Sequence, residues 1–100
     1  MIEIRRGDDL NAFGKEVVLV LNTEQDLSSC RAVFEVDGFR QEWNDITSKR
    51  LPIIMTREDT QKLKAGHRFG YVKVYDENNL AETVKKEICV VVHPEVVKND

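Results

Sequence analysis

The sequence predicts an all-β protein: an antiparallel, immunoglobulin-like β-sandwich of about seven to eight short strands, with one short helical turn near residues 57–63. Short runs of alternating, β-branched and aromatic residues recur along the chain, and Gly, Pro, Asn or Asp bound them. No apolar pattern of helical period extends beyond about two turns. The 100 residues fit one domain, with the sandwich expected over 1–93 and a tail or linker over 94–100.

Three strands are predicted in the first part of the chain. Residues 2–5 alternate apolar and charged side chains, as an edge strand does. Residues 15–21 are rich in Val and Leu and predict a strand with both faces partly apolar. Residues 30–36 alternate as well, and the alternation predicts four side chains that face the interior: Cys30, Ala32, Phe34 and Val36.

Turn and breaker residues locate the next two strands. Asp37-Gly38 predicts a tight hairpin turn, after which residues 39–43 pair back on the preceding strand. Residues 51–55 predict another strand, and Pro52 places it at a sheet edge or at a strand start.

The predicted helical turn has signals at both of its ends. Thr56 is suited to cap the first backbone amides, and Asp59 suits the positive end of the turn. Leu63 is its apolar anchor, and Gly66 allows the left-handed exit that a side chain resists. The turn is too short to pack by itself, so we expect a crossover between two sheets.

The last two strands are predicted at residues 68–75 and 84–92, joined by a turn in which Asn residues take positive φ. Alternation predicts that five of their residues face the core: Val72, Val74, Ile88, Val90 and Val92. Three aromatic residues are then left on the outer face: Phe69, Tyr71 and Tyr75.

These outer aromatic residues and Trp43 are the candidate partner-binding residues, because aromatic side chains are enriched at the centres of interfaces. A structural interpretation stays open for all four. A misassigned face or a covering loop would bury Phe69, Tyr71 and Tyr75, and Trp43 equally fits a core position at one end of the sandwich.

The charge pattern argues against nucleic acid and membrane as partners. The net charge is −3, and the basic residues occur in pairs rather than in a cluster. The longest apolar run, residues 89–92, is too short to span a bilayer. No signal-peptide pattern is visible, so we expect the chain to be made and kept in a cytosol, where Cys30 and Cys89 stay reduced.

No constellation in the sequence predicts catalysis, a metal or a cofactor. His67 and His93 stand alone, and the cysteines lack metal-ligand spacing. The neighbouring carboxylates Asp8-Asp9 and Asp76-Glu77 read as turn residues rather than as an acid–base pair. No phosphate-binding, nucleophile-elbow or dinucleotide pattern is present, so we expect a protein that is not an enzyme.

Several short motifs follow one another in a recognisable order: Ile4-Arg5-Arg6-Gly7-Asp8, Ala32-Val33-Phe34-Glu35-Val36, Asp45-Ile46-Thr47, Thr56-x-x-x-Thr60-x-x-Leu63-x-x-Gly66, Val72-Lys73-Val74-Tyr75-Asp76, Thr83 and Ile88-x-Val90-x-Val92. In this order the chain resembles the N-terminal domain of the phage baseplate upper protein family, found in tailed phages and prophages of Gram-positive bacteria. The segment from Thr56 to Gly66 is the most specific part, and Asn78-Asn79 departs from the family, where a Gly is common.

The resemblance implies a β-sandwich that attaches to a central tail hub in the virion, while later parts of the polypeptide carry receptor-binding proteins. It implies other tail and baseplate proteins as partners and a homo-oligomer in the assembly.

Two other classes of function remain open at this stage. A carbohydrate-binding or adhesin-like module would use Trp43 and Tyr75 as stacking platforms. A small intracellular inhibitor protein would fit the size of the chain.

Overall fold

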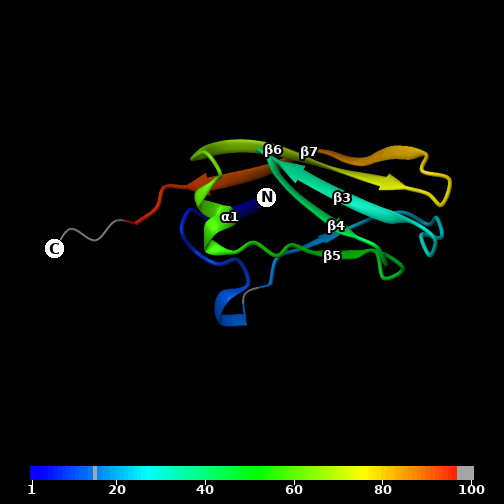
Figure 1. Ribbon diagram of the computed structural model, residues 1–100, viewed down its shortest axis with the longest axis horizontal. Coiled ribbons are helices and arrows are strands. Elements are labelled where there is room, and N and C mark those ends of the chain that lie inside the picture. The colour runs from blue at the N-terminus through cyan, green and yellow to red at the C-terminus, as the bar shows by residue number, and fades with distance from the viewer. Residues whose placement is uncertain (15, 97–100) are drawn as a thin grey trace.

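The computed structural model describes residues 1–14 and 16–96, and this part is mostly β-structure (Figure 1). Its elements are β1 (Ile2–Arg5), η1 (Ala12–Gly14), β2 (Val18–Val20), β3 (Arg31–Val36), β4 (Phe39–Trp43), β5 (Arg50–Pro52), α1 (Arg57–Gln61), β6 (Gly66–Tyr75) and β7 (Ala81–His93). Five strands form one sheet in the order β1-β7-β6-β3-β4, and β2 pairs with β5 in a second sheet. The all-β prediction is confirmed.

The large sheet is mixed, so the prediction of a wholly antiparallel arrangement was wrong. β1 runs parallel to β7, with Ile2 opposite Val90 and Arg5 opposite His93. The other described pairs are antiparallel. β1 and β7 are separated by most of the sequence, so no local turn signal can predict that they pair.

Strand lengths also differ from the prediction. β6 has 10 residues and β7 has 13, longer than the short strands expected. β2 and β5 have 3 residues each, shorter than the predicted segments 15–21 and 51–55, and Lys15 lies outside the described residues. Two further backbone hydrogen bonds extend the pairing of β2 with β5 beyond these three residues. The Leu21 amide donates to the Lys49 carbonyl at 2.8 Å, and the Ile53 amide donates to the Val17 carbonyl at 2.9 Å.

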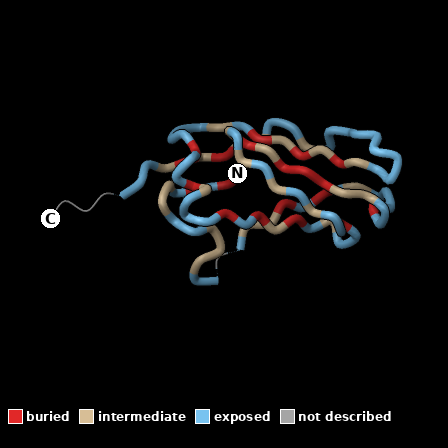
Figure 2. Tube along the Cα trace, viewed as in Figure 1, coloured by how far each residue is buried: buried red, intermediate tan, exposed pale blue. Residues whose placement is uncertain are grey.

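One hydrophobic core lies between the two sheets, and buried residues follow the strands as expected (Figure 2). The predicted inward positions are confirmed as buried for Ala32, Phe34, Val36, Val72, Val74, Val90 and Val92. Cys30 and Ile88 are half-buried and pack against the margin of this core, and both cysteines are free thiols.

The helical turn is confirmed, together with its cap. The Thr56 hydroxyl accepts from the Asp59 amide at 3.3 Å, and the Asp59 carboxylate accepts from the Thr56 amide at 3.0 Å. This reciprocal pair satisfies amides that the first turn leaves free. Leu63 is buried in the core, and Gly66 has φ +116°. α1 connects β5 of the small sheet with β6 of the large one, so it is the crossover that the sequence predicts.

The turn between β3 and β4 is confirmed as a tight turn with positive φ at both central residues, 48° at Asp37 and 87° at Gly38. Asp37 has a second role, because its carboxylate accepts from the Lys64 amide at 2.8 Å and from the Arg68 guanidinium at 2.9 Å. These two hydrogen bonds lower the pKa of Asp37 below its ordinary value, and the one from the Lys64 amide has the larger effect.

Replacing Asp37 with Asn is expected to lower the free energy of unfolding at neutral pH by roughly 1 kcal/mol, because hydrogen bonds to a charged acceptor are stronger than those to a neutral one. The folded-state pKa is depressed, so this stabilisation is present above the unfolded-state value of about 3.9 and is lost as the pH falls through the folded-state pKa. Urea titrations at a series of pH values should show the difference between the two proteins closing in acid. A difference of constant size across the series would contradict the assignment.

The predicted tail begins after β7. Residues 94–96 form neither helix nor strand, and residues 97–100 lie outside the described residues.

Candidate functional site

Three of the four predicted partner-binding residues share one surface. We call the face of the large sheet that is turned away from β2 and β5 the outer face. Phe69, Tyr71 and Tyr75 lie on it, because their neighbours Val72 and Val74 are buried against the core. The face continues across β3 through Arg31, Val33 and Glu35, which the register places opposite Tyr75, Lys73 and Tyr71.

Phe69 is the most exposed of these aromatic residues, with 64% of its surface accessible. Cys89 lies opposite it on β7, and Val91 is the next residue of β7 on the same face. Both neighbours are half-buried. Phe69, Cys89 and Val91 form what we call the apolar patch. Cys89 and Val91 were not among the predicted partner-binding residues, although the alternation that places Val90 and Val92 in the core places them on the opposite face.

The side chain of Tyr71 makes contacts with two neighbouring residues of the outer face, Glu35 and Lys73. Its hydroxyl donates a short hydrogen bond to the carboxylate of Glu35. This bond, together with burial and the charge of Glu35, raises the pKa of Tyr71 above its ordinary value. The ammonium group of Lys73 lies 5.8 Å from the centre of the Tyr71 ring, within the range of a cation–π contact.

Tyr75 is held in a similar way. The guanidinium carbon of Arg31 lies 4.2 Å from the centre of its ring. The same guanidinium group donates to Glu42 at 3.0 Å and to the side chain of Asn79 at 2.6 Å. Tyr75 is therefore part of a connected polar surface across β6, β3 and β4.

One residue on the outer face is nevertheless buried. Val33 is only 3% exposed, although its side chain points away from the core between the two sheets. The register places it between Lys73 and Glu42, with Tyr71 and Tyr75 as diagonal neighbours within reach of an aromatic ring. Tyr71 and Tyr75 thus have a structural task, whereas Phe69 remains open to solvent.

Trp43 lies on the other face of the sheet. It pairs with the buried residue Ala32, and its indole N–H donates to the Pro52 carbonyl of β5 at 3.0 Å. The side-chain amide nitrogen of Gln41 (Nε2) donates to the same carbonyl at 3.1 Å. Trp43 connects the two sheets at the margin of the core, so the structure does not bring it together with Phe69, Tyr71 and Tyr75.

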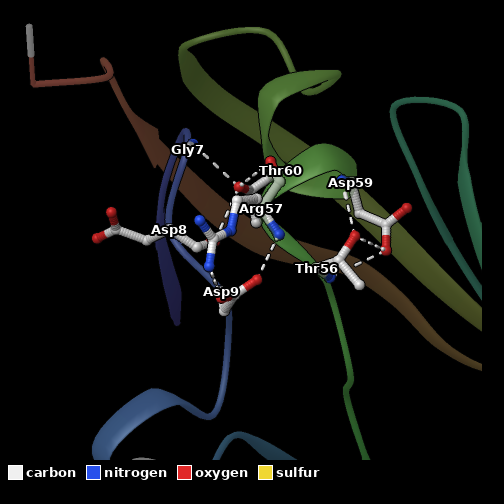
Figure 3. Close-up of polar contacts among 7 residues, drawn as sticks. All are labelled: Gly7, Asp8, Asp9, Thr56, Arg57, Asp59 and Thr60. Atoms are coloured by element: carbon white, nitrogen blue, oxygen red, sulfur yellow. Dashed lines mark hydrogen bonds and ion pairs between the residues drawn. The ribbon is translucent and has the colours of Figure 1, made fainter.

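A second cluster surrounds Thr60, the buried polar residue of α1 (Figure 3). Its hydroxyl accepts from the Gly7 amide at 3.0 Å and lies 2.9 Å from the Asp8 carbonyl, to which it can donate. Asp9 reaches the same turn, since its carboxylate accepts from the Arg57 amide at 2.6 Å and from the Arg57 guanidinium at 3.2 Å. The loop after β1 is therefore tied to α1.

The carboxylates of this cluster do not converge on one point. Figure 3 shows the side chain of Asp8 directed away from α1, while that of Asp9 is directed toward Arg57. Both residues were predicted as turn residues only. The capping role of Asp9 has no local signal in the sequence, because the turn that it caps begins 48 residues later. The arrangement holds two segments together rather than presenting an acid–base pair.

Of the two histidines, His93 lines the same surface hollow as Asp8, Asp9 and Arg57. His67 is exposed on β6, and the Nε2 of His93 lies 3.7 Å from a carboxylate oxygen of Glu3. Within residues 1–14 and 16–96, no group of three or more His, Cys, Asp or Glu side chains is placed to hold a metal ion. Over the same residues, no helix has the length and apolar character needed to cross a membrane.

No protein-family model matches the chain, and searches of curated proteins and of solved structures found no match.

Proposed function

We propose that this chain is a non-enzymatic structural component of a phage or prophage tail, located in the baseplate, where it docks onto a central tail hub and connects receptor-binding proteins to it. The proposal includes self-association in the assembly. It also includes the finer description of the fold as an immunoglobulin-like β-sandwich, with β2 and β5 as part of its second layer.

The observation that carries the proposal is the contact between two segments in which the chain resembles the baseplate family. The opening segment 4–8 and the segment 56–66 meet at Thr60, whose hydroxyl accepts from the Gly7 amide at 3.0 Å. The Arg6 guanidinium donates to the Gln61 carbonyl at 2.8 Å. Hydrogen bonds between the two motifs make them mutually consistent parts of one fold, and this supports the fold that the resemblance implies.

The apolar patch supports a docking role on the outer face. An aromatic side chain open to solvent, next to apolar neighbours and bordered by charged residues, has the composition of an interface centre with a polar rim. Here Phe69 is the exposed aromatic residue. Charged residues border the patch, because Glu3 of β1 lies opposite Val91 and Glu35 of β3 lies opposite Tyr71, the next residue of β6 on the same face.

Replacing Phe69 with Ser is expected to reduce incorporation of the chain into tails at least about tenfold, because removing an aromatic anchor from an interface costs more than about 1.4 kcal/mol. The fold should persist, since the side chain is 64% exposed. The measurement is the copy number of the chain per particle, by quantitative mass spectrometry of particles assembled with the variant alone.

Phe13 provides a matched control for that variant. It is fully exposed on η1, outside the large sheet, so Phe13→Ser removes the same side chain without touching the outer face. Equal incorporation of Phe69→Ser and of the unaltered chain would remove the apolar patch from the docking role.

The tail assignment itself is tested on unaltered particles. The chain should be present in a fixed ratio to other tail proteins in purified phage or induced prophage particles. Its absence from particles, with the protein left free in the lysate, would count against the assignment.

A further inference from the structure

The two sheets differ in length, and this difference leaves one end of the large sheet without a second layer. β2 ends at Val20, whereas β6 and β7 continue to the hairpin between Tyr75 and Ala81. The loop 21–30 returns to the start of β3 at the same end of the molecule (Figure 1). An open groove lies between this loop and the hairpin.

The groove combines an apolar floor with an exposed apolar wall. Its volume is about 690 Å³, within the range of roughly 300–1,000 Å³ that is typical of ligand sites. Leu21, Leu27 and Val74 belong to the core and form part of the lining. Leu80, 69% exposed, and Val84 are apolar residues of the hairpin side. Neighbouring apolar side chains left open to solvent are typical of interaction surfaces.

The charged residues that line the groove are mostly acidic. Asp26, Asp76 and Glu82 face a single lining cation, Lys85. Lys49 is also near, with its ammonium group donating to the Thr23 carbonyl at 2.7 Å. Backbone amides of their own turns occupy one carboxylate oxygen each of Asp26 and Asp76. The lining residues themselves thus carry three carboxylates and one ammonium group, a charge balance that favours a cationic ligand.

We infer that this groove binds an extended peptide segment of a partner protein, in which apolar side chains alternate with basic ones. Alternation places successive side chains on opposite sides of an extended chain. The apolar side chains contact the floor and the Leu80 wall, while the basic side chains reach the carboxylates of the rim. The inference rests on the proposed function only for the identity of the partner as another tail protein.

The test uses the peptide acetyl-Lys-Leu-Lys-Leu-Lys-amide as the probe and follows amide shifts of the isotopically labelled chain by NMR. We expect saturable shifts confined to the groove residues, with a dissociation constant below about 1 mM. The acidic counterpart, acetyl-Glu-Leu-Glu-Leu-Glu-amide, should bind at least about tenfold more weakly, because its charges face the carboxylates.

Two variants locate the binding. Leu80→Ser should weaken binding about fivefold by removing the wall, and Glu82→Gln should weaken it about threefold by removing one charge. Both side chains are exposed, and the structure gives no hydrogen bond or ion pair for Glu82 among the described residues, so the fold should be retained. Ile54→Ser and Glu58→Gln are the matched controls: both residues are exposed and outside the groove, and both variants should bind like the unaltered chain.

Three results would overturn the inference. One is equal affinity for the basic and the acidic peptide, and another is shifts that fall outside the groove or fail to saturate up to about 1 mM. The third is a change of the groove shifts with protein concentration alone, which would make a second copy of this chain the occupant.

The outcome can be separated from that of the proposed function. If Leu80→Ser and Glu82→Gln lose peptide binding but enter particles normally, the groove is not the docking site and the tail assignment stands. If the chain is absent from particles while the purified protein binds the basic peptide, the tail assignment fails and the groove inference stands.

Discussion

Replacing Thr60 with Val is expected to lower the free energy of unfolding by about 2–3 kcal/mol. Valine keeps the shape of the side chain but removes the hydroxyl, which is fully buried. The Gly7 amide then loses its acceptor, and the Asp8 carbonyl loses its donor. Chemical denaturation followed by circular dichroism measures the change.

Thr60→Ser is the matched control, because it keeps the hydroxyl and removes only a methyl group, which costs about 1 kcal/mol. If the Val variant is as stable as the unaltered chain, the hydroxyl contributes nothing and the contact between residues 6–9 and α1 depends on other hydrogen bonds. A loss of stability clearly larger in the Val variant than in the Ser variant would show that one hydroxyl group holds together two segments of the sequence pattern.

Replacing Gly70 with Ala is expected to lower the free energy of unfolding by about 2–3 kcal/mol through overpacking. An added Cβ atom would lie 2.8 Å from the Glu35 carbonyl oxygen and 2.8 Å from the Phe34 ring, with Val36 at 3.1 Å. One of these neighbours is backbone of the adjacent strand, so the contact cannot be relieved by a side-chain rotation. Thermal and urea unfolding should both report the loss.

Gly14→Ala separates this steric effect from backbone strain. Gly14 has φ +73° and nothing within 4 Å of an added Cβ, so its substitution carries only the conformational cost of about 1 kcal/mol. A Gly70 variant no less stable than the Gly14 variant would mean that β3 and β6 move apart easily at this point.

The local elements were predictable because their signals lie within a few residues of one another. Asp37-Gly38 predicts a tight turn, since few residues tolerate positive φ, and the structure has φ 48° and 87° there. Thr56, followed three residues later by Asp59, predicts a capped turn, and both cap bonds are present. Neither prediction needed knowledge of a distant segment.

The candidate site was predictable only in part. Alternation along β6 places Phe69, Tyr71 and Tyr75 on one face, and the structure agrees. The alternation does not show that Tyr71 and Tyr75 lie beside Val33, because that depends on the register between β6 and β3. Nor does it show that Trp43 reaches the Pro52 carbonyl, because that depends on how the second sheet lies against the first.

The sequence by itself determined the β-rich character, the positions of the turns, the cap of α1 and the side of most strands that faces the core. These features follow from side-chain period and from the φ preferences of single residues, which act locally. Only the tertiary structure decided that β1 runs parallel to β7, that Thr60 and Asp9 join the loop after β1 to α1, and that the short second sheet leaves a groove beside Leu80. Each of these depends on which distant segments bury their apolar faces together, and that choice is made by packing over the whole core rather than by any run of neighbouring residues.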